Sequence, residues 1–141
     1  MINLTDEELY QKLTESGGVN ELIIDSDIIK DETYGDIVLH MYICVDIMKK
    51  RCSVIMDNIM HRIPYCSIFD HGQYVMFINR DTLESEFFDA KLMMFKGKED
   101  ARIDRKYPKY WEETGFVDKF LQVEKVLKRI ASEIKDTPWA L

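Results

Sequence analysis

The sequence predicts an α+β fold in which helices pack mainly on one face of a single mixed β-sheet. Three observations indicate this class. Residues 36–45 (DIVLHMYICV) are almost all apolar and rich in β-branched types, as in a strand covered on both faces. Residues 116–134 repeat apolar side chains at helical spacing. The pair His71-Gly72 separates two apolar segments, and glycine supplies the positive φ of a tight hairpin turn.

Capping and turn residues define the N-terminal elements. Thr5 and Glu8 form a capping box, which predicts that a short helix begins here. Two consecutive glycines end this helix, and residues 19–24 are then expected to form a strand. The following segment 25–35 (DSDIIKDETYG) is expected to be a loop or a short hairpin connection.

The middle of the chain predicts a helix between two strands. From Asp46 onward apolar residues recur at helical spacing, and Pro64 prevents the helix from continuing. Strands at 36–45 and 65–70 would flank this helix in a right-handed βαβ crossover, which would place them parallel, with antiparallel hairpins added. The apolar positions of the predicted helix are Met48, Cys52, Ile55, Met56, Ile59 and Ile63.

The C-terminal half predicts a strand over 86–95 (EFFDAKLMMF), a polar loop over 96–114, and a helix from about Gly115. The complete order is then α-β-β-α-β-β-β-α, with a βαββ core. The length of 141 residues, without repeats or linkers, predicts one α+β domain spanning residues 1–141.

Charge is distributed unevenly along the chain. The net charge of −7 disfavours the whole molecule as a nucleic-acid binder. Residues 1–36 hold ten acids and two lysines, whereas residues 91–109 hold seven basic residues and three acids. The acidic third is expected to contact a protein partner with a basic surface, such as a nucleic-acid enzyme or a toxin. The candidate contact residues are Asp25, Asp27, Asp31 and Glu32.

Location and cofactors are predicted from what the sequence contains. The first ten residues carry acids where a signal peptide has basic residues followed by an apolar stretch. Apolar runs stay well short of the roughly 18 residues that a membrane span requires. Three cysteines without CxxC spacing argue against a disulfide framework. We therefore expect a cytoplasmic protein without a membrane segment, with free buried thiols and without a cofactor.

Residues 36–95 carry a resemblance to a known family. An apolar strand precedes a helix-like segment ending in NIMHRIPY, and CSIFDHGQYVMFINR follows. This succession resembles an uncharacterised bacterial family encoded beside helicases and DNA-modification enzymes in phage-defence regions. The resemblance implies an accessory protein of a defence or counter-defence system, and it brings no catalytic residues.

The histidines and cysteines near the middle of the chain are weighed as a metal or catalytic site. Cys52, His61, Cys66 and His71 follow one another at spacings of nine, five and five, which match no zinc-ligand pattern. A nucleophilic Cys44 or Cys66, paired with a histidine, would lie in a covered strand, where burial raises the pKa of a thiol. We expect neither a metal site nor a catalytic cysteine.

Two alternative functions remain open. Asp70, and Asp89 with Lys91, resemble the aspartate and acid-x-lysine pattern with which restriction-type nucleases hold a divalent cation. The segment 96–111 interleaves basic and aromatic residues, which would suit phosphate contacts and base stacking. The candidate nucleic-acid contacts there are Lys98, Arg102, Arg105 and Tyr107. Because no catalytic constellation is coherent, we expect a non-enzymatic protein–protein interaction module, such as an accessory, immunity or inhibitor protein.

Overall fold

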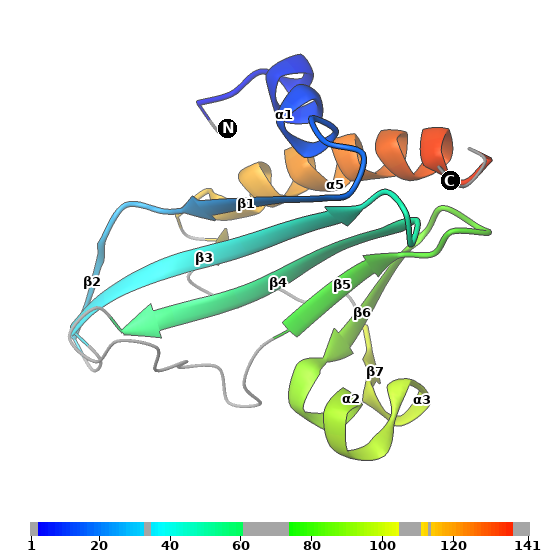
Figure 1. Cartoon of the computed structure of the whole chain (residues 1–141). Helices are drawn as coiled ribbons and strands as arrows, with labels where there is room; N and C mark the ends of the chain where they lie inside the picture. Colours follow the sequence, from blue (N-terminus) through cyan, green and yellow to red (C-terminus); the bar gives the residue numbers. More distant parts are fainter. Residues whose placement is uncertain (1–2, 33–34, 61–73, 105–110, 113, 137–141) are drawn as a thin grey trace.

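A seven-stranded β-sheet forms the centre of the computed structural model, and every described strand pairing in it is antiparallel. The structure describes residues 3–32, 35–60, 74–104, 111–112 and 114–136 (Figure 1). The strand order is β1-β3-β4-β5-β6-β7, with β2 paired to β3. The strands are β1 (Val19–Asp25), β2 (Ile29–Asp31), β3 (Gly35–Asp46), β4 (Arg51–Met60), β5 (Tyr74–Ile78), β6 (Ser85–Asp89) and β7 (Arg102–Ile103).

Helices lie on both faces of this sheet, but the longer helices lie on one face and the shorter helices on the other. α1 (Asp6–Leu13) and the long α5 (Phe116–Ile134) lie over one face, called here the helix-covered face (Figure 1). The short α2 (Ala90–Lys96) and α3 (Lys98–Ala101) lie on the second face, beside β5, β6 and β7. The predicted α+β class, with helices mainly on one face, is confirmed. Within the described residues, no helix is both long and apolar enough to cross a membrane.

The main hydrophobic core lies between α5 and the helix-covered face. Alternate side chains of β3 are completely buried there, as the period-two pattern of a strand requires. The apolar stripe of α5 packs on them, and Phe120 lies within aromatic contact distance of Phe87 and Trp111. The buried β3 residues are Ile37, Leu39, Met41, Ile43 and Val45. The predicted C-terminal helix and its buried stripe are confirmed.

The N-terminal helix has the predicted capping box. The backbone N–H of Glu8 donates to Thr5 Oγ1 at 3.1 Å, and the N–H of Thr5 donates to Glu8 Oε1 at 3.0 Å. α1 is then tied to α5, because Arg129 contacts Glu7 at 2.7 Å and stacks 3.9 Å from the centroid of the Tyr10 ring. The capping residues therefore start α1, and the contacts with α5 fix the position of this helix.

The second face is only partly covered by the described helices. A small cluster of Val75, Phe88 and Ala101 packs under α2 and α3. Beyond it, the β3 residues that point to this face are half-buried, so the strand is not covered on both faces as its composition predicts. An antiparallel sheet tolerates this arrangement, because one face packs on the core while the other meets water.

The predicted helix over residues 46–63 is wrong. Residues Arg51–Met60 form strand β4, which pairs with β3 from Asp46↔Arg51 to Ile37↔Met60. The intervening turn is tight, and Lys50 in it has the left-handed φ of 54°. In place of a βαβ crossover, the chain therefore forms a long β3–β4 hairpin. The predicted parallel strand 65–70, the residues 61–63 and the His71-Gly72 turn lie outside the described residues.

The segment between β6 and α5 also differs from the prediction. The expected strand over 86–95 stops at Asp89, whose carboxylate accepts a hydrogen bond from the backbone N–H of Leu92 at 3.0 Å. This N-cap starts α2, so only the first four residues of the predicted strand are extended. The expected polar loop over 96–114 contains α3 and the short β7.

Candidate functional site

The predicted acidic contact residues gather at one end of the sheet. Asp25 ends β1, Asp27 follows it, and Asp31 and Glu32 lie at the end of β2. Asp27 and Glu32 are exposed. Asp25 Oδ1 lies 2.6 Å from His40 Nδ1 on the neighbouring strand, which fixes the orientation of its carboxylate. These four acids, called here the acidic rim, border the second face beside β1 and β2.

Apolar side chains lie next to the acidic rim. Ile23, Tyr42 and Ile55 are directly opposite one another on β1, β3 and β4, so they form one row across the second face. Ile23 is 54% exposed, and Tyr42 and Ile55 are half-buried. A hydrogen bond with Glu21 raises the pKa of the Tyr42 hydroxyl to about 12. This row is an apolar surface with acids at its border.

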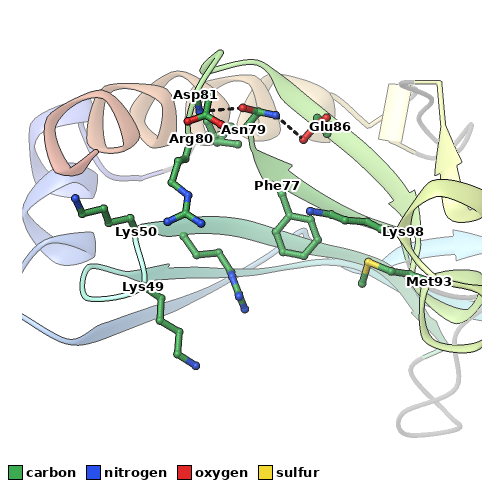
Figure 2. Close-up of a pocket in the computed structure, with 11 residues that line it drawn as sticks. Lys49, Lys50, Phe77, Asn79, Arg80, Asp81, Glu86, Met93 and Lys98 are labelled. Atoms are coloured by element: carbon green, nitrogen blue, oxygen red, sulfur yellow. Dashed lines mark hydrogen bonds between the residues drawn. The ribbon is translucent and has the colours of Figure 1, made fainter. Parts of the chain in front are cut away.

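A different part of the second face carries a positively charged cavity of 560 Å³ (Figure 2). Its basic side chains come from three separate segments. Lys49, Lys50 and Arg51 belong to the β3–β4 turn and the start of β4, Arg80 belongs to the β5–β6 turn, and Lys98 begins α3. This site is called the basic cavity below.

The two carboxylates of the basic cavity do not balance its five cations. Glu86 accepts a hydrogen bond from Arg102 Nη1 at 2.8 Å and from Asn79 Nδ2 at 3.3 Å, and the contact with Arg102 lowers its pKa. Asp81 is the other acid of the lining. The basic cavity therefore has a positive local charge in a chain whose net charge is −7.

An aromatic ring lies beside these cations. Phe77 on β5 lines the basic cavity, and Lys98 Nζ lies 4.8 Å from the centroid of its ring. Lys98 Nζ also lies 5.2 Å from the centroid of the Phe88 ring, as does the Arg102 guanidinium carbon. Figure 2 shows Lys49, Lys50 and Arg80 toward one side of the cavity and Phe77, Met93 and Lys98 toward the other.

The predicted nucleic-acid contacts are only partly described. Lys98 lines the basic cavity, and Arg102 reaches its border through Glu86. Arg105 and Tyr107 lie outside the described residues. Arg80 is not among the predicted contact residues, and neither are Lys49, Lys50 and Arg51, which fall within the segment predicted to be a helix. The run of three basic residues at 49–51, separated from the predicted strand by only three residues, is the signal for a turn.

The nuclease alternative depends on Asp70, Asp89 and Lys91, which the structure places differently from the acid-x-lysine pattern. Asp89 is 4% exposed and caps α2, whereas Lys91 is exposed on that helix. The two side chains therefore do not belong to one strand. Asp70 lies outside the described residues.

We predict that Asp89 acts as a helix cap, and two substitutions test this role. Asp89→Ala is expected to lower the free energy of unfolding by about 1–2 kcal/mol, because the N–H of Leu92 loses its acceptor. Asp89→Asn should cost much less, because asparagine caps helices about as well as aspartate. Urea titrations of both variants measure the difference. Equal losses in the two variants would show that the charge, and not the cap, is what matters at this position.

The cysteines and histidines form no described metal site. Cys52 is buried as predicted, and burial raises the pKa of its thiol to about 12. Burial also raises the pKa of Cys44. Among the residues that the structure describes, no group of three or more histidine, cysteine, aspartate or glutamate side chains could hold a metal ion. Cys66 and His71 lie outside that part of the chain.

Comparison with known proteins gives no relative. No family model, no curated protein and no solved structure matches this chain. The resemblance of residues 36–95 to a family of phage-defence regions therefore stays a prediction.

Proposed function

We propose that this protein is a non-enzymatic interaction module that binds a protein partner through the acidic rim and the apolar row beside it. The observation that carries the proposal is their position side by side on the second face of the sheet. Over β1, β3 and the adjoining part of β4, none of the described helices covers this face.

The composition of this surface supports a protein partner. Stable interfaces combine an apolar centre with a polar border. Two apolar side chains beside the acidic rim, Ile23 and Ile28, are each about half exposed, which gives a partner apolar area to bury. The hydrophobic gain of such burial is roughly 25 cal/mol for each Å² removed from water.

The acids indicate the charge of the partner. Asp27 and Glu32 are exposed, and a basic protein surface would both accelerate association with them and exclude acidic competitors. Nucleic-acid enzymes and many toxins have such basic surfaces, because they contact phosphates. We therefore propose an accessory, immunity or inhibitor protein that acts in the cytoplasm on a partner of this kind.

We predict that Asp27→Lys combined with Glu32→Lys reduces partner binding at least about tenfold, because it reverses the charge that faces the partner. Both side chains are exposed, so the thermal unfolding midpoint should change little. Quantitative affinity capture from lysate of the native host, followed by titration of the purified partner, measures the effect.

Glu15→Lys combined with Glu84→Lys is the matched control, because it changes the net charge equally and uses two exposed acids away from the acidic rim, one between α1 and β1 and one between β5 and β6. The control should retain full affinity. Equal losses in the two double variants would assign the effect to net charge alone. A partner that binds the Asp27/Glu32 variant as tightly as the native protein would refute the proposed surface.

A further inference from the structure

The unbalanced charge of the basic cavity points to a ligand of opposite charge. Within the described part of the chain, no carboxylate lies within ion-pair distance of the side-chain cations of Lys49, Arg51 or Arg80. The nearby Asp46 carboxylate accepts a hydrogen bond from the backbone N–H of Lys49 at 3.0 Å. Cations that converge on one cavity repel one another, and this repulsion is relieved when an anion binds between them. Lys50 is different, because its Nζ donates to the backbone carbonyl of Lys135 at 2.8 Å.

The chemistry of these side chains favours phosphate. Arginine presents a planar fork of donors that matches the oxygens of phosphate, and lysine adds a compact charge. Arg51 and Arg80 supply two such forks, and Lys49 adds the charge of its ammonium group. Lys49 and Arg80 come from turns at the same end of the sheet, so the cations approach a ligand from two directions (Figure 2).

The opposite side of the basic cavity adds a surface for a flat apolar group. Phe77 and Met93 line this side, and the Phe77 ring is half-buried with Lys98 close to it. A nucleobase stacks on an aromatic ring with a gain of about 1–3 kcal/mol per base, whichever base it is. The volume of 560 Å³ is within the usual range of about 300–1,000 Å³ for small-ligand sites.

We infer that the basic cavity binds a nucleoside phosphate, with the phosphate held between Lys49, Arg51 and Arg80 and the base placed against Phe77. The ligand is either a free nucleotide or a nucleotide of a single strand. This site is separate from the acidic rim, so it does not depend on the proposed protein partner.

The net charge of −7 does not prevent such binding. At physiological ionic strength, exposed charges more than about 8 Å apart are largely screened from one another. The acidic rim lies beside β1 and β2, whereas the basic cavity lies at the β3–β4 and β5–β6 turns. A ligand in the cavity therefore experiences mainly the nearby cations, and its affinity should fall as the salt concentration rises.

The test titrates the ¹⁵N-labelled 141-residue chain with ATP, with inorganic phosphate and with a short oligo-dT strand at physiological ionic strength, where distant charges are screened. We expect saturable binding of ATP or of the strand, with amide shifts concentrated in residues 47–51 and 77–81. Binding of ATP but not of the strand would identify a free nucleotide as the ligand, and the reverse result would identify a single strand.

Two variants distinguish the parts of the site. Lys49→Glu combined with Arg80→Glu is expected to weaken binding of the nucleoside-phosphate probe at least about tenfold, because two charge-assisted contacts are lost. Phe77→Leu should weaken ATP or strand binding at least about fivefold and leave the weaker binding of inorganic phosphate unchanged. Thermal melts check that each variant is folded.

Lys12→Glu combined with Lys128→Glu is the matched control, since it makes the same change in net charge with exposed lysines of α1 and α5. This control should leave the affinity of the cavity within about twofold of the native value. The inference is overturned if neither ATP nor the strand shows saturable binding. It is also overturned if the control loses as much affinity as the cavity variant, or if Phe77→Leu has no effect on ATP and strand binding.

Discussion

Replacement of Phe120 by alanine is expected to lower the free energy of unfolding by about 3–5 kcal/mol. Phe120 is fully buried, and its ring lies 6.1 Å from the ring of Phe87 and 6.4 Å from the ring of Trp111 between centroids. Alanine removes most of this contact area and leaves a cavity that the surrounding sheet cannot close. Chemical denaturation followed by circular dichroism measures the loss.

The neighbouring residue provides the control for this prediction. Leu121 lies on the same helix and is 41% exposed, so Leu121→Ala should cost less than about 1 kcal/mol. Similar losses at the two positions would mean that α5 does not pack on the sheet in the orientation described. A loss below 1 kcal/mol at Phe120 would contradict the buried aromatic cluster directly.

The elements that could be predicted from sequence are those with local signals. Thr5 and Glu8 satisfy each other's backbone donors within one turn of chain, so their pairing needs no distant residue. α5 is predicted for a similar reason, because its apolar stripe repeats over nineteen residues. A periodic pattern of that length has few alternative structures.

The sequence of strand β4 predicts a helix because its apolar residues fit two periods. Cys52 and Met56 are four residues apart, which suits one helix face, but they are also an even number apart, which suits one strand face. Val54 and Ile55 distinguish a strand from a helix only when the neighbouring strands are known. The pairing of β4 with both β3 and β5 stabilises the strand. No signal in the local sequence of β4 indicates this pairing.

The two candidate sites also differ in whether they could be predicted from the sequence. The acidic rim was predictable because its residues are close in sequence and lie on β1, on β2, in the loop between them and directly after β2. The basic cavity was not, because its cations are contributed by segments as far apart as Lys49 and Lys98. Only the order of the strands brings the β3–β4 turn next to the β5–β6 turn. In the predicted fold, in which this segment is a helix, the two turns do not exist side by side, so nothing brings these cations together.

Placing a carboxylate at Val54 is therefore the most direct test of this part of the fold. Val54 is completely buried on the helix-covered face, so Val54→Asp should lower the free energy of unfolding by at least about 3 kcal/mol, because it buries a charge without a partner. A helix over 46–63 would instead place residue 54 opposite the apolar stripe, where aspartate costs little. Thermal and urea unfolding compare the variant with the native protein.

The matched substitution is Ser53→Asp, one residue earlier on the same strand. Ser53 lies opposite Cys44 and Phe77 on the second face and is half-buried, so a carboxylate there can remain in contact with water. We expect a loss below about 1 kcal/mol for this variant. A one-residue shift along a strand moves a side chain to the other face, whereas on a helix it turns the side chain by about 100°. A small loss at Val54 together with a large loss at Ser53 would therefore reverse the two faces of β4, and with them the side of the sheet on which the basic cavity lies.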